Sequence, residues 1–259
     1  AAAQLQWRRE SVAQMQREFD YDALTDDGKL SYDMWVINLE RDEEQARFQR
    51  YQFLLGRGGA HASLPNFMIN FHRVDTVEDA EAYIARLEQL GTALQQVLER
   101  AKLAVADGIR QPRFNYDFAI EEVGRVMSGA PFIDSPNDSP LWADIQTKIN
   151  ALMERDLVEP ERAEALINDA RSALTDRVQP AYLEVLDWLQ TDREQAPTTE
   201  VGAATLPDGE AYYRSRLRMM TTLDLTPDAI HETGLAEVAR IRDEMAAIKE
   251  QVGFEGSLA

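Results

Sequence analysis

The chain of 259 residues contains no cysteine. This absence excludes disulfide scaffolds, thiolate zinc sites, iron–sulfur clusters and cysteine nucleophiles. A helical zinc-peptidase motif needs two histidines four positions apart, with a glutamate directly after the first. His231 and Glu232 begin such a pattern, but Leu235 stands where the second histidine would be. The other two histidines, His61 and His72, are expected to be structural. The residues alone therefore assign neither a metal ligand nor a catalytic group.

Basic residues are few beside acidic ones, with 27 Lys and Arg against 46 Asp and Glu and a formal charge of −19. A surface this negative repels nucleic-acid phosphates and anionic lipid headgroups. No apolar run reaches the roughly 18 residues that span a bilayer. Neither a phosphate-binding glycine loop nor the Gly-x-Ser-x-Gly elbow of serine hydrolases occurs. We expect no nucleic-acid partner and no membrane insertion by this chain.

Alternating strand patterns are missing, whereas helical periodicity runs through most of the sequence. The clearest stripe has apolar or small residues at spacings of three and four from Val77 to Val105. Thr76 precedes it and is a residue type that caps helix N-termini. Gly91 lies within the stripe, so a neighbouring helix is expected to approach closely there.

Further helices are predicted at five places, one of them opening at Thr226-Pro227 with a stripe from Ile230 to Ile248. Pro180 is expected to kink or end the helix that contains it. The sequence predicts an all-α fold of long antiparallel helices, as a bundle or an irregular array. We treat 1–259 as a single helical region. The additional helices are expected over 5–19, 31–55, 139–152, 160–178 and 226–252.

Two polar segments stand out from the apolar stripes. The acidic run from Glu40 to Glu44 is expected to be a solvated helix face, with Arg47 pairing with Glu43. The segment 209–218 is denser in tyrosine and arginine than packing requires. Its arginines could simply neutralise the many carboxylates, or its side chains could bind a peptide carboxylate or carbonyl. The residues predicted to bind substrate are Tyr212, Tyr213 and Arg214.

Several blocks of the sequence together resemble one bacterial family. The resemblance is strongest in Leu-Pro-Asp-Gly-Glu-Ala-Tyr-Tyr at 206–213 and in Leu-Thr-Pro-Asp-Ala-Ile-His at 225–231. On these blocks the chain is similar, over nearly its whole length, to the N-terminal half of the family called domain of unknown function 885. Weaker blocks occur in the same order at 29–33, 72–87, 108–112, 179–182, 234–238 and 253–258.

The resemblance implies a helical protein similar to zinc metallopeptidases, often exported or lipid-anchored. In such proteins the metal-binding segment, of the type His-Glu-x-x-x-x-Gly-His-His, lies well downstream of the block at 253–258. The sequence ends at Ala259, so no catalytic or zinc-binding residue can be assigned by resemblance. We therefore expect no cofactor in this chain and zinc in the full-length protein.

The function that the resemblance implies is the N-terminal, non-catalytic portion of a zinc-dependent peptidase. These helices are then expected to form one wall of the substrate cleft, with a peptide as the substrate of the full-length protein. The alternative is a helical binding or scaffold module without catalytic activity. A partial protein is expected to expose an apolar patch or to cover it by forming a homodimer. The expected location is periplasmic or secreted, with a lipid anchor as one form and the cytoplasm as the alternative.

Overall fold

The structure is a computed structural model that describes residues 2–199 and 201–257. Over these residues the fold is all-α, as predicted, and it contains no β-strand. In chain order the α-helices are α1 (Ala2–Glu18), α2 (Asp26–Arg47), α3 (Ala60–Asn70), α4 (Val77–Ala106), α5 (Arg113–Val126), α6 (Pro140–Glu154), α7 (Pro160–Ala173), α8 (Gln179–Arg193), α9 (Gly209–Thr221) and α10 (Pro227–Gln251). No described helix combines the length and apolar character needed to cross a bilayer.

The chain divides into two compact units. Residues 50–207 form one of them, which we call the central unit, and residues 1–49 with 208–259 form the other, the terminal unit. The central unit holds α3 to α8 and the terminal unit holds α1, α2, α9 and α10. That 1–259 behaves as a single helical region stays a prediction.

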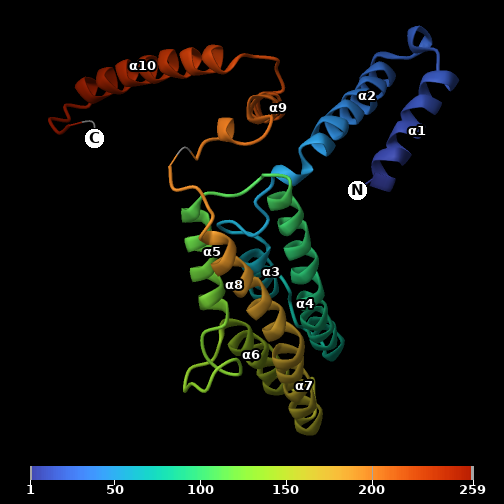
Figure 1. The fold of residues 1–259 in the computed structure, drawn as a ribbon, viewed down its shortest axis with the longest axis vertical. Coiled ribbons are helices and arrows are strands. Elements are labelled where there is room, and N and C mark those ends of the chain that lie inside the picture. The colour runs from blue at the N-terminus through green and yellow to red at the C-terminus, as the bar shows by residue number, and fades with distance from the viewer. Residues whose placement is uncertain (1, 200, 258–259) are drawn as a thin grey trace. The chain divides into compact units, whose positions relative to one another are not determined.

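The core of the central unit is built around α4, which packs against α7 and α8, while α5 packs on the other side of α8 (Figure 1). The predicted stripe of α4 is the buried one. Its leucines at 87, 94 and 98 are completely shielded from solvent. They join apolar side chains from α5, α6, α7 and α8 in one continuous cluster. This burial of apolar area is the main source of stability for the unit.

Both special positions of α4 behave as the sequence predicts. The Thr76 hydroxyl accepts a hydrogen bond from the Asp79 N–H at 3.2 Å, and the Asp79 carboxylate accepts one from the Thr76 N–H at 3.0 Å. This reciprocal capping box satisfies two N–H groups that the first turn leaves free. At Gly91 an added Cβ would lie 2.4 Å from the Arg177 carbonyl oxygen. The close approach therefore requires glycine.

The interruption predicted at Pro180 takes the form of a π-helical turn. This turn, Leu174–Val178, separates α7 from α8, and Pro180 stands in the first turn of α8. A proline ring clashes with the carbonyl four residues earlier in an α-helix, and the wider turn changes that spacing. Beyond the proline, Tyr182 and Leu189 are fully buried, so the apolar face continues into α8.

The terminal unit is much more open. In it α1 and α2 pack side by side as a helical hairpin (Figure 1). Trp7 of α1 and Trp35 of α2 meet edge to face, with ring centroids 6.1 Å apart, yet both remain about half exposed. Along α10 every side chain from His231 to Ile248 is exposed. This unit has few buried side chains of its own.

Candidate functional site

A surface pocket of about 190 Å³ lies within the terminal unit, between α2 and α9. Each helix contributes residues three, four or seven positions apart, which is the spacing of one helix face. The lining is mixed in charge, because glutamates and arginines alternate with apolar and hydroxyl side chains. The pocket is lined by Ile37, Glu40, Arg41, Glu44, Gln45, Ser215, Arg218, Met219 and Thr222.

Contacts at the start of α9 connect it to the end of α2. Arg47 of α2 lies 3.3 Å from the Asp208 carboxylate, and the ring of Phe48 lies 5.6 Å from that of Tyr212. Ser215, a small buried residue of α9, lines the pocket one turn further on. Together these contacts align the pocket face of α9 with that of α2.

The backbone at both ends of α9 is unusual. Asp208 has φ of 48° and Thr222 has φ of 61°, which place two residues with side chains in the left-handed region. Such conformations are uncommon outside glycine and are often found at functional sites. Thr222 also lines the pocket.

The acidic run of α2 is paired differently from the prediction. Asp42 and Glu43 pair with arginines of α1, at 2.9 and 2.7 Å, and hold the helical hairpin together. Arg47 was expected to pair with Glu43 but pairs with Asp208 instead, because Glu43 faces α1. The side chains of Glu40 and Arg41 form no ion pair or hydrogen bond within the described residues, and both line the pocket.

The three residues predicted to bind substrate lie on the first two turns of α9, beside the pocket lining. Tyr212 packs against Phe48, and Tyr213 is 46% exposed. Arg214 pairs with Glu210 of the same helix at 3.0 Å, where both side chains are well exposed. None of the three lines the pocket. Their role in binding stays a prediction, and the segment 209–218 that drew attention to them contributes Ser215 and Arg218 to the pocket.

Among the histidines, His61 is the most buried. Its Nε2 lies 2.9 Å from the Glu122 carboxylate, which also accepts the Gly58 N–H at 3.0 Å. Its Nδ1 has no hydrogen-bond partner in the described structure. Burial lowers the pKa of His61, although the hydrogen bond to Glu122 opposes this. A neutral imidazole that donates from Nε2 fits these contacts and links α3 to α5.

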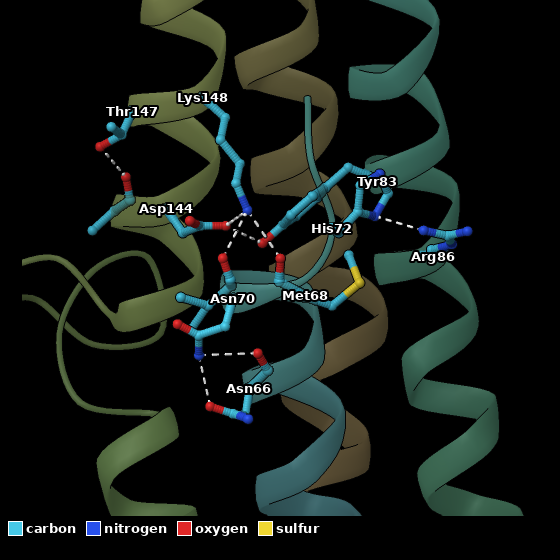
Figure 2. A network of polar contacts seen from close by, with 11 residues as sticks. Asn66, Met68, Asn70, His72, Tyr83, Arg86, Asp144, Thr147 and Lys148 are labelled. Atoms are coloured by element: carbon cyan, nitrogen blue, oxygen red, sulfur yellow. Dashed lines mark hydrogen bonds and ion pairs between the residues drawn. The ribbon is translucent and has the colours of Figure 1, made fainter. Parts of the chain in front are cut away.

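A second polar network joins α3, α4 and α6 (Figure 2). The Lys148 ammonium donates to the Met68 and Ile69 carbonyls at 2.9 and 3.1 Å and to Asp144 at 2.7 Å. The hydroxyl of Tyr83 donates to the same carboxylate at 2.8 Å. A cation suits the C-terminal carbonyls of α3, and all three ammonium donors are used. This network is therefore structural support for the core.

These residues do not fit a zinc ion. His72 Nδ1 accepts a hydrogen bond from Arg86 at 2.9 Å, and His61 Nε2 is bound to Glu122. His231 is exposed on α10. In residues 2–199 and 201–257 no group of three His, Asp or Glu side chains could hold a metal ion. We therefore derive no chemical step through a metal from this chain.

The α1–α2 hairpin carries a second hollow, which is larger and almost purely apolar. It measures about 400 Å³, and none of its lining side chains is charged. With no charged side chain it lacks groups that would orient a polar substrate. The α2–α9 pocket is thus the better candidate for specific recognition. The hollow is lined by Ser11, Met15, Phe19, Leu24, Gly28, Ser31, Tyr32 and Trp35.

Residues 1–259 match the model of a family described as bacterial protein of unknown function (DUF885). Among solved structures, the chain is similar to a protein from Colwellia psychrerythraea described as a candidate lipoprotein, with 25% identity and a TM-score of 0.70. The match covers 79% of this chain and 34% of that protein, so the chain spans about a third of its relative's length. No curated protein matches the sequence.

Proposed function

Since the chain belongs to the bacterial family DUF885, we propose that it is the N-terminal, non-catalytic portion of a zinc-dependent peptide hydrolase. Its part is to supply one wall of the substrate cleft. In this proposal the zinc ligands lie outside residues 1–259, and no residue of this chain is catalytic. The relative from Colwellia, of which this chain matches about a third, supports a longer protein.

The observation that carries the proposal is the mixed charge of the α2–α9 pocket. A peptide presents carbonyl oxygens, N–H groups and, at its ends, a carboxylate and an ammonium. Arginine side chains bind carboxylates with paired N–H donors, whereas glutamates accept from N–H groups. Arg218 and Glu44 are 4.0 Å apart, which is too long for a hydrogen bond, and Arg218 is 55% exposed. Both side chains can therefore turn toward a ligand.

The proposed location is outside the cytoplasm, in the periplasm or secreted, with a lipid anchor as one form. The relative from Colwellia is described as a candidate lipoprotein, and this supports the proposal. The cytoplasm is the alternative. Fractionation of cells that express the native gene would separate the two, since an exported form should appear in the periplasmic, membrane or culture fraction.

The pocket is tested by titrating the chain with trialanine and with trialanine amide, which lacks the terminal carboxylate, in a calorimeter. We expect trialanine to bind and Arg218→Gln to weaken that binding about fivefold, as for a partly exposed charged hydrogen bond. Arg214→Gln, on the same helix but outside the pocket, separates the pocket from the residues predicted at 212–214, because it should leave the affinity unchanged only if the pocket is the binding site.

Three outcomes would contradict this assignment. If both variants bind like the parent chain, the pocket is not the peptide site. If only Arg214→Gln loses affinity, the residues predicted from the sequence at 212–214 are the binding site instead. If trialanine does not bind at all, the chain has no subsite for a short peptide.

The hydrolase activity is tested with a longer form of the protein, translated from the same reading frame beyond residue 259. A downstream histidine–glutamate–histidine cluster, with peptide cleavage that a chelator abolishes, is the expected result. Residues 1–259 alone should not cleave. A reading frame without such a cluster would leave the helical scaffold module as the function.

A further inference from the structure

The apolar stripe of α10 is uncovered from Gly234 to Ile248. Val238, Ile241, Met245 and Ile248 are between 45% and 57% exposed, and Val252 beyond the helix is 71% exposed. Figure 1 shows α10 as one uninterrupted helix. The stretch 231–252 is about 33 Å long at the normal rise of a helix. An exposed apolar ridge of this length marks an interaction surface.

The spacing of this ridge is that of a coiled coil. From Val238 to Val252 the apolar residues follow one another at intervals of three, four, three and four. This gives the 3.5-residue period in which a and d positions keep facing a partner helix, with Val238, Met245 and Val252 at a. Ile241 and Ile248 occupy the d positions. The register extends back to His231 and Gly234, where the ridge is weaker.

Charges flank the ridge with one sign on each side. The g positions hold Glu237 and Glu244, and the e positions hold Arg242 and Lys249. In a parallel coiled coil each g residue meets the e residue five positions later in the partner helix. Glu237 would then meet Arg242 of a second copy, and Glu244 would meet Lys249. An antiparallel pair would instead place glutamate against glutamate and arginine against lysine.

From this complementarity we propose that copies of this chain associate through parallel pairing of their α10 helices. The partner is a second copy of the chain, because α10 carries both the apolar ridge and the two rows of opposite charge that a parallel pair of identical helices requires. The interface involves none of the residues of the α2–α9 pocket. It can therefore stand or fall independently of the proposed peptide site.

Contacts within α10 leave these charges available. Arg240 bonds to Glu237 at 2.8 Å and to Glu244 at 2.7 Å, in exposed pairs of the kind that stabilise a helix only slightly. Each of these carboxylates contacts Arg240 through one oxygen. Arg242 and Lys249 form no ion pair in the part of the chain that the structure describes. The interhelical pairs can thus form without unfolding the helix.

The absence of native cysteine makes orientation directly measurable. In a parallel pair residue 245 lies against its own counterpart, so Met245→Cys should form a disulfide-linked dimer under mild oxidation. The matched control is Ala246→Cys, one position away and directed from the ridge, which should remain uncrosslinked. Equal crosslinking of both variants, or of neither, would overturn the parallel arrangement.

Charge reversal tests the same proposal in solution. Sedimentation velocity over a wide concentration range should show that the parent chain self-associates, as a dimer or as a trimer in which three α10 helices pair. Glu244→Lys should weaken association about tenfold, since two attractive pairs become repulsive. The double variant Glu244→Lys/Lys249→Glu should restore it. Circular dichroism of each variant confirms that the helices are intact.

Two results would overturn the proposal. Tighter association of Glu244→Lys would indicate antiparallel pairing, because it would remove a glutamate–glutamate contact. A parent chain that stays monomeric at every concentration would show that the ridge binds something other than a second copy, such as a helix of a longer form of the protein.

Discussion

The helices α4 and α10 carry similar apolar stripes and have opposite environments. In α4, in the central unit, the stripe is buried under neighbouring helices from Ala80 to Leu98, and only its two ends are partly exposed. In α10, in the terminal unit, every side chain from His231 to Ile248 is exposed. Among the described residues of the terminal unit, the buried ones are Val12, Phe48, Gly209 and Ser215.

The difference shows what a stripe does and does not specify. Its period fixes which helix face must be covered, because removing apolar area from water lowers the free energy of the folded chain. It does not specify whether the cover comes from the same unit, from another part of a longer protein or from a second molecule. The central unit contains its own core, whereas the terminal unit has surface left to bury. The following substitutions, made in matched pairs across the two units, test this difference.

The largest expected contrast is between two leucines. Leu94 of α4 is completely buried, and Leu235 of α10 is 53% exposed. Leu94→Ala should lower the free energy of unfolding of the central unit by about 2–5 kcal/mol, through lost burial and a cavity. Leu235→Ala should change stability by less than about 0.5 kcal/mol. Urea unfolding in dilute solution measures both, and equal losses would contradict the contrast.

The next pair is of glycines, and the expected effects differ in sign. Gly91→Ala places a Cβ 2.4 Å from a backbone oxygen, so α4 must move, which costs about 1–3 kcal/mol. At Gly234 of α10 an added Cβ meets nothing within 4 Å. Gly234→Ala should raise the helicity of α10, with a local gain of about 0.5–1 kcal/mol. Thermal unfolding and circular dichroism give the two signs, and a stabilising Gly91→Ala would disprove the close helix contact.

Helix caps provide a smaller contrast. Thr76→Ala removes the capping box of α4 and should lower the stability of the central unit by about 1 kcal/mol. Thr226 caps α10 in a similar way, accepting from the Ala229 N–H at 3.2 Å. Thr226→Ala should fray only the start of α10. Hydrogen exchange read helix by helix would show the first effect across the core and the second confined to α10.

The pH dependence of the central unit should be the mildest effect. Burial lowers the pKa of both His61 and His72 below the ordinary value of 6.5 that each has when unfolded. The unfolded chain therefore binds more protons below that pH, so stability is full above about pH 6.5 and declines as the pH falls through the folded-state values. Urea unfolding at a series of pH values measures this. His61→Gln should flatten the decline, and an unchanged slope would exclude His61 as its source.

Local rules predicted much of the fold. The cap at Thr76, the close contact at Gly91 and the interruption near Pro180 follow from backbone chemistry that a few neighbouring residues determine. The N-terminal helices were placed less well. The helix predicted over 31–55 is α2, which begins at Asp26 and ends at Arg47. Its many charged residues interrupt the regular spacing of apolar residues from which the ends of a helix are predicted.

The α2–α9 pocket could not be predicted in the same way. It combines Glu40 and Arg41 with Ser215 and Arg218, which are more than 170 positions away in the sequence. Pairing such distant helices depends on tertiary contacts, including Arg47 with Asp208. Sequence spacing offered one signal, the faces 37–45 and 215–222, each with residues three, four and seven apart. Composition drew attention to the adjacent tyrosines instead.

Amide hydrogen exchange of the parent chain, measured at low and at high protein concentration, tests the central claim most directly. The account predicts slow exchange in α4 at both concentrations. In α10 it predicts fast exchange when dilute and marked protection when concentrated, as copies cover the apolar ridge. Protection of α10 equal to that of α4 in dilute solution, or exchange in α10 that concentration does not change, would contradict it.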